Sequence, residues 1–494
     1  MTPTELSIIG MFIAFAAGVV SCMRFTTPNR LFSIPVVVSS VALVCTGLVY
    51  VLPGPSGVRF LFGQNMVIDA LTTFHLILVN VLFLITSIYA TGYFKNEHLT
   101  IPYIRRYCML WQTFQALLVI VLLSNNIGIM WVALEATTIV SSFLIVRESA
   151  PLSVEAMWKY LLICSVGIVF AFMGTILTLA AASQLEGVDA PYLFNQLHAH
   201  AGLIEPKLML FAFIFIVVGF GTKAGLSPMH TWLPDAHSQA PTPVSAVFSG
   251  VMLNVALYCI LRYLPIAEAA LGRDGQAHAI LLLFGFMSLF FAAVFIPVQN
   301  DMKRFLAYCS VEHLGIISIG LGIGGIGTFA ALLHTTGHSL SKIVAFFSSG
   351  YIGEHYKTRD MRKLSGAVEQ LPLWGTGFFV GVLVLIGVAP SVLFISEFLI
   401  VKEAFFQHRY VVVGALITGV MIIFLSGLKF AMHVSFGTHD KREPLSHTFP
   451  VRIIDRVIVT GCLIIALLLG LWIPVSFSEL LKSAGTAIEN GIGL

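Results

Sequence analysis

Ionisable side chains inside long apolar segments are the residues of this sequence best suited to chemistry. Glu135, Lys223 and Glu397 stand among apolar neighbours, and an uncompensated charge within a membrane costs about 2.5–3.5 kcal/mol or more. Such a group normally faces the protein interior or a water-filled path, because it needs a partner or hydration. Carboxylates and amines held there can bind and release protons, so these three residues are candidates for proton transfer.

The segment 326–352 places further titratable side chains at a helical spacing. His334, His338 and Lys342 follow one another at intervals of four residues, and a regular helix would set them along one face. Histidine titrates near neutral pH, so a hydrated stripe of this kind can pass protons. Alternatively, Gly337 and the surrounding Ser and Thr residues interrupt the helix, which would open backbone groups to water.

Other ionisable residues in apolar segments complete the set of candidates. Glu312 and His313 are adjacent within the segment 304–323, and Lys159 begins the segment 158–182. Each has a structural alternative, since a membrane carboxylate can be a static hydrogen-bonding group and a terminal lysine can extend to the membrane surface. The interfacial or structural alternative applies most strongly to a group of residues near segment ends or in polar surroundings: Lys159, His334, Lys402, Glu403 and His433.

The composition defines the elements that must position these groups. Of 494 residues, 57% are hydrophobic and 10% are charged, whereas soluble domains are about a quarter charged. These figures exclude a soluble enzyme, a disordered chain and a collagen-like chain. At about 20 apolar residues per membrane helix, the segments predict an all-α polytopic membrane protein with about fourteen spans: 5–22, 33–52, 72–93, 104–123, 126–146, 158–182, 207–227, 243–263, 279–298, 304–323, 326–352, 373–404, 411–433 and 454–474.

Basic residues indicate the orientation of these spans. Most basic residues outside the spans lie in the odd-numbered connections, for example Arg105, Arg106, Lys303, Arg304 and Arg359. Cytoplasmic connections carry an excess of Lys and Arg, so the odd-numbered connections are expected in the cytoplasm and both termini outside. The net charge of +3 is small and no basic cluster with interleaved aromatic residues occurs, so no nucleic-acid partner is expected.

Cysteines and glycine motifs give no sign of a bound cofactor. Iron–sulfur clusters and structural zinc sites need several ligands at short spacing. The 7 cysteines are scattered and include no C-x-x-C pair, so no metal, redox centre or other cofactor is expected. The run GLGIGG at 320–325 matches a nucleotide-binding pattern, but it lies in an apolar segment and is interpreted as helix packing.

Prolines interrupt two of the predicted spans. The seventh span runs into Pro228, and the twelfth contains Gly387 and Pro390 before Glu397. Proline breaks a membrane helix, and irregular backbone is tolerated there only where it is buried or lines a cavity. Two interrupted spans five apart predict two inverted five-helix repeats, spans 4–8 and 9–13. The predicted parts of the chain are 1–100 with three helices, 101–265 and 279–435 as two half-channels, and 450–494 with a C-terminal helix.

Three stretches of the sequence resemble a known family. They are the proline-rich stretch from Lys223 to Ser245 with the run HTWLPDAH, DMKRFLAYCSVEHLG at 301–315, and SEFL at 396–399. Over roughly residues 70–435, the chain resembles the antiporter-like subunits of respiratory complex I, Mrp-type cation/proton antiporters and membrane-bound hydrogenases. Within this family, it is most similar to the branch of hydrogenase-4 component F, found in complexes of formate hydrogenlyase type.

The resemblance implies roles for individual residues. In the family, a Glu on the fifth span pairs with a Lys on the seventh, and a Lys or His on the eighth relays the proton. A Lys or Glu on the interrupted twelfth span exchanges the proton with the outside. Glu135, Lys223 and Glu397 match the fifth, seventh and twelfth positions.

The match is incomplete on the eighth span. Asn254 stands where many relatives have Lys, and an amide cannot carry a proton charge, so His338 or a water chain would have to bridge this position. The resembling motifs also contain His230, and the adjacent Glu312 and His313 fit the hydrogenase-type branch. These residues join the predicted proton-transfer set.

The sequence thus predicts a membrane subunit that moves protons along a Glu, Lys and His axis, in which Glu135 controls the charge of Lys223. The resemblance implies neighbouring membrane subunits, a peripheral redox arm, H⁺ with Na⁺ as an alternative ion, and a bacterial cytoplasmic membrane. Such a chain would be part of an oxidoreductase complex, with no redox centre of its own. Two alternatives stay open: a cation/proton or inorganic-carbon uptake subunit with a soluble partner, and a non-pumping membrane anchor, which Asn254 favours.

Overall fold

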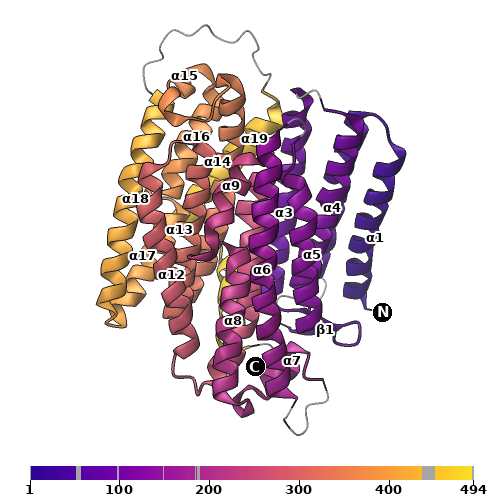
Figure 1. The fold of residues 1–494 in the computed structure, drawn as a ribbon, viewed down its shortest axis with the longest axis vertical. Coiled ribbons are helices and arrows are strands. Elements are labelled where there is room, and N and C mark those ends of the chain that lie inside the picture. The colour runs from indigo at the N-terminus through magenta and orange to yellow at the C-terminus, as the bar shows by residue number, and fades with distance from the viewer. Residues whose placement is uncertain are drawn as a thin grey trace.

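The protein is a bundle of long helices that run roughly along one axis (Figure 1). The computed structural model describes residues 2–51, 57–96, 99–147, 150–183, 185, 190–436 and 451–491. Both marked chain ends lie in the lower half of the view in Figure 1. This placement agrees with the expected even number of crossings, which puts both termini on one side of the membrane.

The first part of the chain folds into helices and one short hairpin. Side-chain caps fix some of the helix starts: Asp69 accepts a hydrogen bond from the Thr72 amide, and Asn126 accepts one from the Gly128 amide. The elements are α1 (Pro3–Arg24), α2 (Pro28–Val51), the antiparallel strands β1 (Arg59–Leu61) and β2 (Met66–Ile68), α3 (Ala70–Tyr93), η1 (Phe94–Asn96), α4 (Ile101–Leu123), α5 (Ile127–Ile145), α6 (Pro151–Ala182), α7 (Phe194–Ala199), η2 (Ala201–Leu203) and α8 (Pro206–Ala224).

The second part is also helical, and it contains one π-helical turn, η4. Its elements are η3 (Met229–Thr231), α9 (Trp232–Gln239), α10 (Thr242–Val247), η4 (Phe248–Met252), α11 (Leu253–Ala270), α12 (Gln276–Phe295), η5 (Ile296–Val298), α13 (Met302–Ile323), α14 (Ile326–Tyr356), η6 (Met361–Lys363), α15 (Ala367–Gln370), α16 (Pro372–Leu385), α17 (Val392–Phe406), α18 (Tyr410–Phe436), α19 (Ile453–Leu471) and α20 (Val475–Asn490).

The helices confirm a multi-pass membrane protein. Among the described residues, 12 helical segments are long and apolar enough to cross a membrane. They correspond to the first ten predicted spans and the last two. The predicted eleventh span is α14, which is rich in Ser, Thr and His, and the predicted twelfth is divided into α16 and α17. The total of about fourteen spans stays a prediction.

Two segments break at the same sequence pattern. α8 ends before Gly225 and the chain becomes helical again after Pro228, while α16 ends before Gly387 and α17 follows Pro390. Both glycines adopt a positive φ, 81° and 73°, which residues with a Cβ atom rarely adopt. This shared Gly-x-x-Pro spacing supports the predicted inverted repeat, which stays a prediction.

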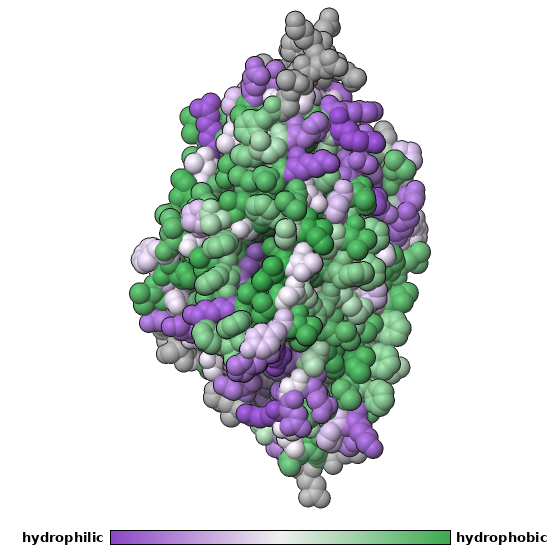
Figure 2. All heavy atoms as spheres, turned by 90° about the vertical axis from the view of Figure 1, so that its left-hand side faces the viewer, coloured by the Kyte–Doolittle hydropathy of each residue, from purple (hydrophilic) through white to green (hydrophobic). Residues whose placement is uncertain are grey.

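The outer surface and the centre of the bundle differ in character. In Figure 2, hydrophobic side chains cover most of the middle of the visible face, and hydrophilic ones gather toward its ends. Peripheral helices expose large apolar side chains, such as Ile13 on α1, Val166 on α6 and Met421 on α18. In contrast, nearly every residue of α11 and α13 is buried. The lipid-facing surface is therefore peripheral, and polar groups on α11, α13 and α14 lie in the protein interior.

A buried ion pair joins two helices of this interior. Arg262 on α11 contacts Asp69, the residue before α3, with distances of 2.5 Å (Nη1 to Oδ2) and 2.8 Å (Nη2 to Oδ1). The guanidinium also donates to the Thr72 hydroxyl at 2.5 Å and, through Nε, to the Tyr258 hydroxyl at 2.8 Å. These additional bonds satisfy the buried charges, so the pair fixes α3 against α11.

Candidate functional site

Lys223 is a fully buried amine in the last turn of α8. Its Nζ donates to the Thr138 hydroxyl at 2.9 Å and to the Tyr160 hydroxyl at 2.5 Å. The Tyr160 hydroxyl also lies 2.6 Å from the hydroxyl of Ser141. Hydroxyl groups from α5 and α6 therefore surround the amine, and each of them can both donate and accept a hydrogen bond.

Glu135 lies one turn before Thr138 on α5, close to the Lys223 cluster but not in contact with the amine. Its Oε1 accepts a hydrogen bond of 3.0 Å from Ser165 on α6, and its Oε2 is buried without a partner. The described residues contain no ion pair between Glu135 and Lys223. The predicted pairing would thus act through space or through Thr138 in this conformation.

His237 on α9 is a buried imidazole enclosed by aromatic rings. Its centroid lies 6.5 Å from that of Trp232, 6.1 Å from Phe248 and 5.6 Å from Phe346. Trp232 in turn lies 4.8 Å from the ring of Tyr160. Both ring nitrogens of His237 lack a hydrogen-bond partner among the described residues, so an entering water molecule would find a donor and an acceptor here.

Asn254 follows the π-helical turn η4 in the eighth predicted span. Its Nδ2 donates to the Gly250 carbonyl at 3.0 Å and to the Ser339 hydroxyl at 2.9 Å, and Ser339 donates to the same carbonyl at 2.7 Å. Its Oδ1 is buried without a partner. π-Helical turns are frequent at functional sites, and here the Gly250 carbonyl joins Asn254 on α11 to Ser339 on α14.

The helix α14 is continuous from Ile326 to Tyr356, so Gly337 does not interrupt it. His334, His338 and Lys342 therefore lie along one face, as the alternative with a regular helix predicts. Lys342 is fully buried and its Nζ donates to the Leu306 carbonyl at 2.5 Å. Both nitrogens of His338 lack a partner in the described part of the chain.

A second cluster joins α13, α14 and α17. His313 Nδ1 lies 3.0 Å from His334 Nε2, and His334 Nδ1 lies 2.9 Å from the Ser396 hydroxyl. The rings of His313 and His338 have centroids 5.1 Å apart. Ligand atoms of His313, His334 and Glu397 all lie within 4.8 Å of one another. This triad could hold a metal ion, but it is also the arrangement that proton exchange between two imidazoles and a carboxylate requires.

Glu397 stands at the border between this cluster and an apolar cavity of about 390 Å³. The cavity lies between α13, α16, α17 and α18, and Ile386, Phe394 and Val420 are among the apolar residues that line it. The carboxylate packs closely against Gly387, whose φ is positive. A Cβ atom added at that position would lie 2.6 Å from Glu397 Oε2. Its Oε1 is buried without a partner.

Lys159 and His230 lie outside these clusters, whereas Glu312 adjoins the second cluster as the neighbour of His313 on α13. Lys159 is half-exposed and pairs with Glu155 at 2.7 Å and Asp235 at 3.2 Å. His230 is buried in the break after α8, where its Nδ1 lies 2.8 Å from the Ser227 hydroxyl. Glu312 is buried on α13 with an unpartnered Oε2.

Some residues of these clusters carry no strong signal in the sequence. Tyr160, Thr138 and Ser141 lie in apolar segments and reach Lys223 only through the packing of α5, α6 and α8. His237 lies in the HTWLPDAH run. Its position close to three prolines is a sequence signal that could have identified it as a candidate. Ser396, which precedes Glu397, could have been found by its position in the twelfth span.

Comparison of the sequence with known proteins identifies a family, and comparison of the structure identifies the fold. The family described as NADH:quinone oxidoreductase/Mrp antiporter, TM matches residues 124–423. A hydrogenase-4 component F homolog of Methylacidiphilum infernorum (isolate V4) is 38% identical over 396 residues, which are 79% of this chain and 82% of that protein. The family match over residues 124–423 covers both breaks and both clusters.

Solved structures share the fold. A chain of the Mrp complex from Dietzia sp. DQ12-45-1b superposes with a TM-score of 0.86 at 18% identity, over 100% of this chain and 98% of that one. A chain of the membrane-bound sulfane sulfur reductase, an archaeal respiratory membrane complex, gives 0.82 at 20% identity over 98% and 97%. Both neighbours are subunits of multi-subunit membrane complexes. This chain is an antiporter-like membrane subunit and belongs to the NADH:quinone oxidoreductase/Mrp antiporter family.

Proposed function

We propose that this subunit moves protons across the membrane along its buried polar residues, within a redox-driven complex. The observation that supports this most is the number of ionisable groups in the core of an apolar bundle. Lys223, Glu312, Lys342 and two of the cluster histidines, His313 and His338, are at most 1% exposed. Each such group carries a desolvation cost that a purely structural helix bundle avoids with apolar residues.

Buried polar atoms without hydrogen-bond partners favour a role in proton transport over a role in a static hydrogen-bond network. Glu135 Oε2, Glu312 Oε2, His313 Nε2, Glu397 Oε1 and both nitrogens of His338 are buried without hydrogen bonds among the described residues. An unsatisfied buried polar atom costs about 1–3 kcal/mol. Such sites are explained if water or a moving proton occupies them during turnover.

In the proposed path, the first half-channel ends at Lys223 and the second runs from Lys342 and His338 through His313 and His334 to Glu397. Asn254 lies between them and orders the Gly250 carbonyl and Ser339 without carrying a proton itself. His237 lies beside the gap, and water at its free nitrogens would connect Lys223 to His338. Glu135 sets the charge of Lys223, and Glu397 exchanges protons with the outer surface.

The setting of this activity is part of the same proposal. The subunit assembles with other membrane subunits and a peripheral redox arm in a bacterial cytoplasmic membrane, with both termini outside. A non-pumping anchor is the alternative that Asn254 favours, since its amide is hydrogen-bonded within the gap and cannot titrate.

The test is proton flux per redox turnover in the reconstituted complex with Glu135→Gln and Glu397→Gln. Both variants keep side-chain size and remove the proton-binding group, so each should lower the flux by about tenfold or more. Glu403→Gln on α17 is the matched control, because Glu403 bonds locally to Gln407 at 2.9 Å and lies outside the path. Wild-type flux in both test variants would support the anchor and refute the proposal.

A further inference from the structure

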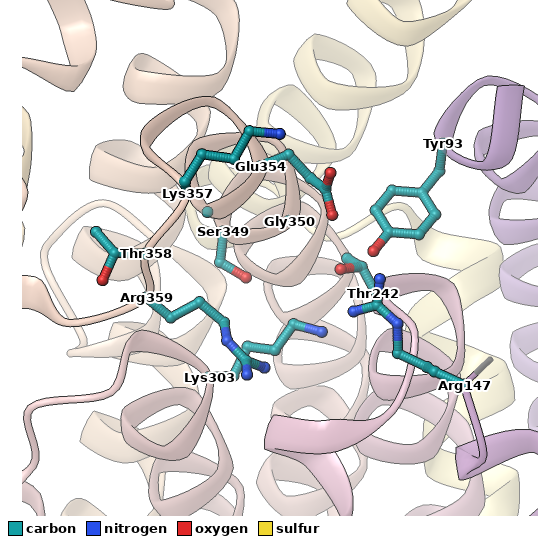
Figure 3. Close-up of a pocket in the computed structure, with 11 residues that line it drawn as sticks. Tyr93, Arg147, Thr242, Lys303, Ser349, Gly350, Glu354, Lys357, Thr358 and Arg359 are labelled. Carbon is teal, nitrogen blue, oxygen red and sulfur yellow. The ribbon is translucent and has the colours of Figure 1, made fainter. Parts of the chain in front are cut away.

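A second cavity, which is polar and has a volume of about 240 Å³, lies away from the proposed proton path. Its walls come from α3, the residues after α5, α10, the start of α13, the end of α14 and residues 357–359. In Figure 3, the polar ends of Tyr93, Arg147, Thr242 and Lys303 point toward a common space. Several separate parts of the chain thus contribute to one polar site.

The charges in this cavity are mostly positive. Arg147, Lys303, Lys357 and Arg359 line it, and Glu354 is the one carboxylate among the lining residues. The lining residues thus carry more positive than negative charge, although Asp301 offsets part of the charge of Arg359. An entrance for protons or sodium ions would be expected to carry carboxylates, so the surplus favours a negatively charged ligand.

Two buried groups at the cavity have unused hydrogen-bonding capacity. Lys303 is 2% exposed, and its one hydrogen bond among the described residues goes to the Ala240 carbonyl at 2.9 Å, although an ammonium has three donors. Thr242 is 1% exposed, and its hydroxyl has no partner in the described part of the chain. A ligand with several acceptor oxygens would satisfy both groups.

Neighbouring contacts hold the cavity walls in place. Arg359 donates from Nη1 to the Ser238 carbonyl, and its Nε lies 3.8 Å from Asp301. Gly350 leaves room for the Thr242 side chain, because a Cβ atom there would lie 2.6 Å from the threonine hydroxyl. The donors are therefore preorganised, which reduces the entropy cost of binding a ligand.

We propose that this cavity binds a phosphoryl group, either of an anionic phospholipid or as inorganic phosphate. Lysine and arginine donors match the three or four oxygens of such a group and form charge-assisted hydrogen bonds with it. The cavity belongs to connections that are rich in basic residues and expected at the cytoplasmic surface. Basic pockets between membrane helices on that side are suited to anionic headgroups. This site is independent of proton transfer.

The experiment uses the purified, delipidated complex in two binding assays. One arm offers vesicles of phosphatidylcholine with phosphatidylglycerol and counts retained phosphatidylglycerol. The other arm offers radiolabelled inorganic phosphate with phosphatidylcholine alone. Retention in the first arm assigns the site to a lipid headgroup, and saturable binding in the second assigns it to free phosphate; either result supports the proposal if it depends on the cavity residues.

Three variants test that dependence, with one matched control. Lys303→Gln and Lys357→Gln should each weaken binding by about tenfold or more, because each removes a charge-assisted donor. Thr242→Val should weaken it by a smaller factor, since it removes one neutral hydroxyl. Lys363→Gln, an exposed lysine on η6 that does not line the cavity, should bind as the wild type does. Lys357 is exposed, so its variant should fold even if Lys303→Gln does not.

Three results would overturn the proposal. The first is the absence of saturable anion binding to the wild-type complex in both arms. The second is an equal loss of binding in Lys357→Gln and Lys363→Gln. The third is a carbodiimide cross-link between Lys357 and a carboxylate of a neighbouring subunit, which would assign the cavity to a protein contact.

Discussion

The Lys223 amine lies among hydroxyl groups, and no carboxylate of the described residues is in direct contact with it. Thr138 and Tyr160 accept its hydrogen bonds, and Glu135 is held one helical turn away by Ser165. Hydroxyls can stay hydrogen-bonded to either the charged or the neutral amine, because they both donate and accept. A carboxylate in contact would instead strongly favour the charged form, so the observed arrangement suits the proton release that we propose for Lys223.

His237→Phe should separate the functional role of this residue from a structural one. Phenylalanine keeps the ring against Trp232, Phe248 and Phe346 and removes two unsatisfied nitrogens. The thermal stability of the detergent-purified subunit should therefore stay equal or rise, by on the order of 1 kcal/mol. Proton flux in the reconstituted complex should fall, because the connection between the two clusters loses its titratable group.

The control for this variant is His433→Phe on α18, where the side chain is exposed. It should leave both stability and flux unchanged. A His237→Phe variant with wild-type flux would remove His237 from the proposed path.

The broken helices place ionisable groups where an intact helix could not. Gly225 and Gly387 turn the chain with positive φ, and the irregular stretches after them lie beside Lys223 and Glu397. Backbone groups freed by such breaks can bind water within a membrane protein. The breaks thus lie next to the buried charged residues and leave backbone groups there that could bind water.

Gly387→Ala should damage the second break. The added Cβ would meet Glu397 Oε2 at 2.6 Å, and the φ of 73° is strained for alanine. We expect a loss of about 1–3 kcal/mol in stability and a reduced proton flux, because Glu397 must move from its position near His313 and His334. Thermal unfolding and reconstituted flux measure the two effects.

Gly414→Ala is the matched control, since it lies on α18 with no atom within 4 Å of the added Cβ. Alanine in a helix is more favourable than glycine by up to about 1 kcal/mol, so this variant should be slightly stabilised with unchanged flux. Equal effects of the two substitutions would show that the break at Gly387 has no special role.

The whole bundle depends on long-range polar contacts as well as on apolar packing. Arg262 and Asp69 are 193 positions apart in the sequence and form a buried pair. Removing one partner of such a pair leaves an uncompensated buried charge, which costs about 3–5 kcal/mol. Asp69→Asn should therefore lower the unfolding temperature strongly, whereas Asp274→Asn, at an exposed turn, should have no measurable effect.

The same pair predicts a pH dependence of stability. Burial alone would raise the pKa of Asp69, but the Arg262 guanidinium outweighs burial and holds the pKa below its usual value of 3.8. Because the folded-state pKa is lowered, the contribution of the pair is complete above pH 3.8 and is lost as the pH falls through the lower folded-state value. Unfolding measured from neutral pH to about 3 should show this loss in the wild type but not in Asp69→Asn.

Much of the architecture follows from local sequence. Apolar length predicts the spans, because each backbone group in a membrane must be bonded within its own helix, and Gly387 with Pro390 predicts the break before α17. The positions of Lys223 and Glu397 are visible in the sequence because charged residues are rare in apolar segments. The continuous α14 shows where local reasoning stops, since Gly337 and its Ser and Thr neighbours fit a break equally well.

Contacts between distant segments could not be predicted in the same way. Tyr160 resembles any aromatic residue of an apolar helix, and only the packing of α6 against α8 brings its hydroxyl to Lys223. Asp69 and Arg262 likewise give no sign of pairing in the sequence. The direct contact expected between Glu135 and Lys223 depended on side-chain direction, which hydropathy does not contain.

Proton flux per redox turnover with Lys223→Ala tests the central claim most directly. The measurement compares the reconstituted wild-type complex with Lys223→Ala and with Lys207→Ala, an exposed lysine at the start of the same helix. If the buried groups form one proton path through Lys223, the flux is lost in Lys223→Ala and unchanged in Lys207→Ala. Wild-type flux in a folded, assembled Lys223→Ala complex would contradict the account.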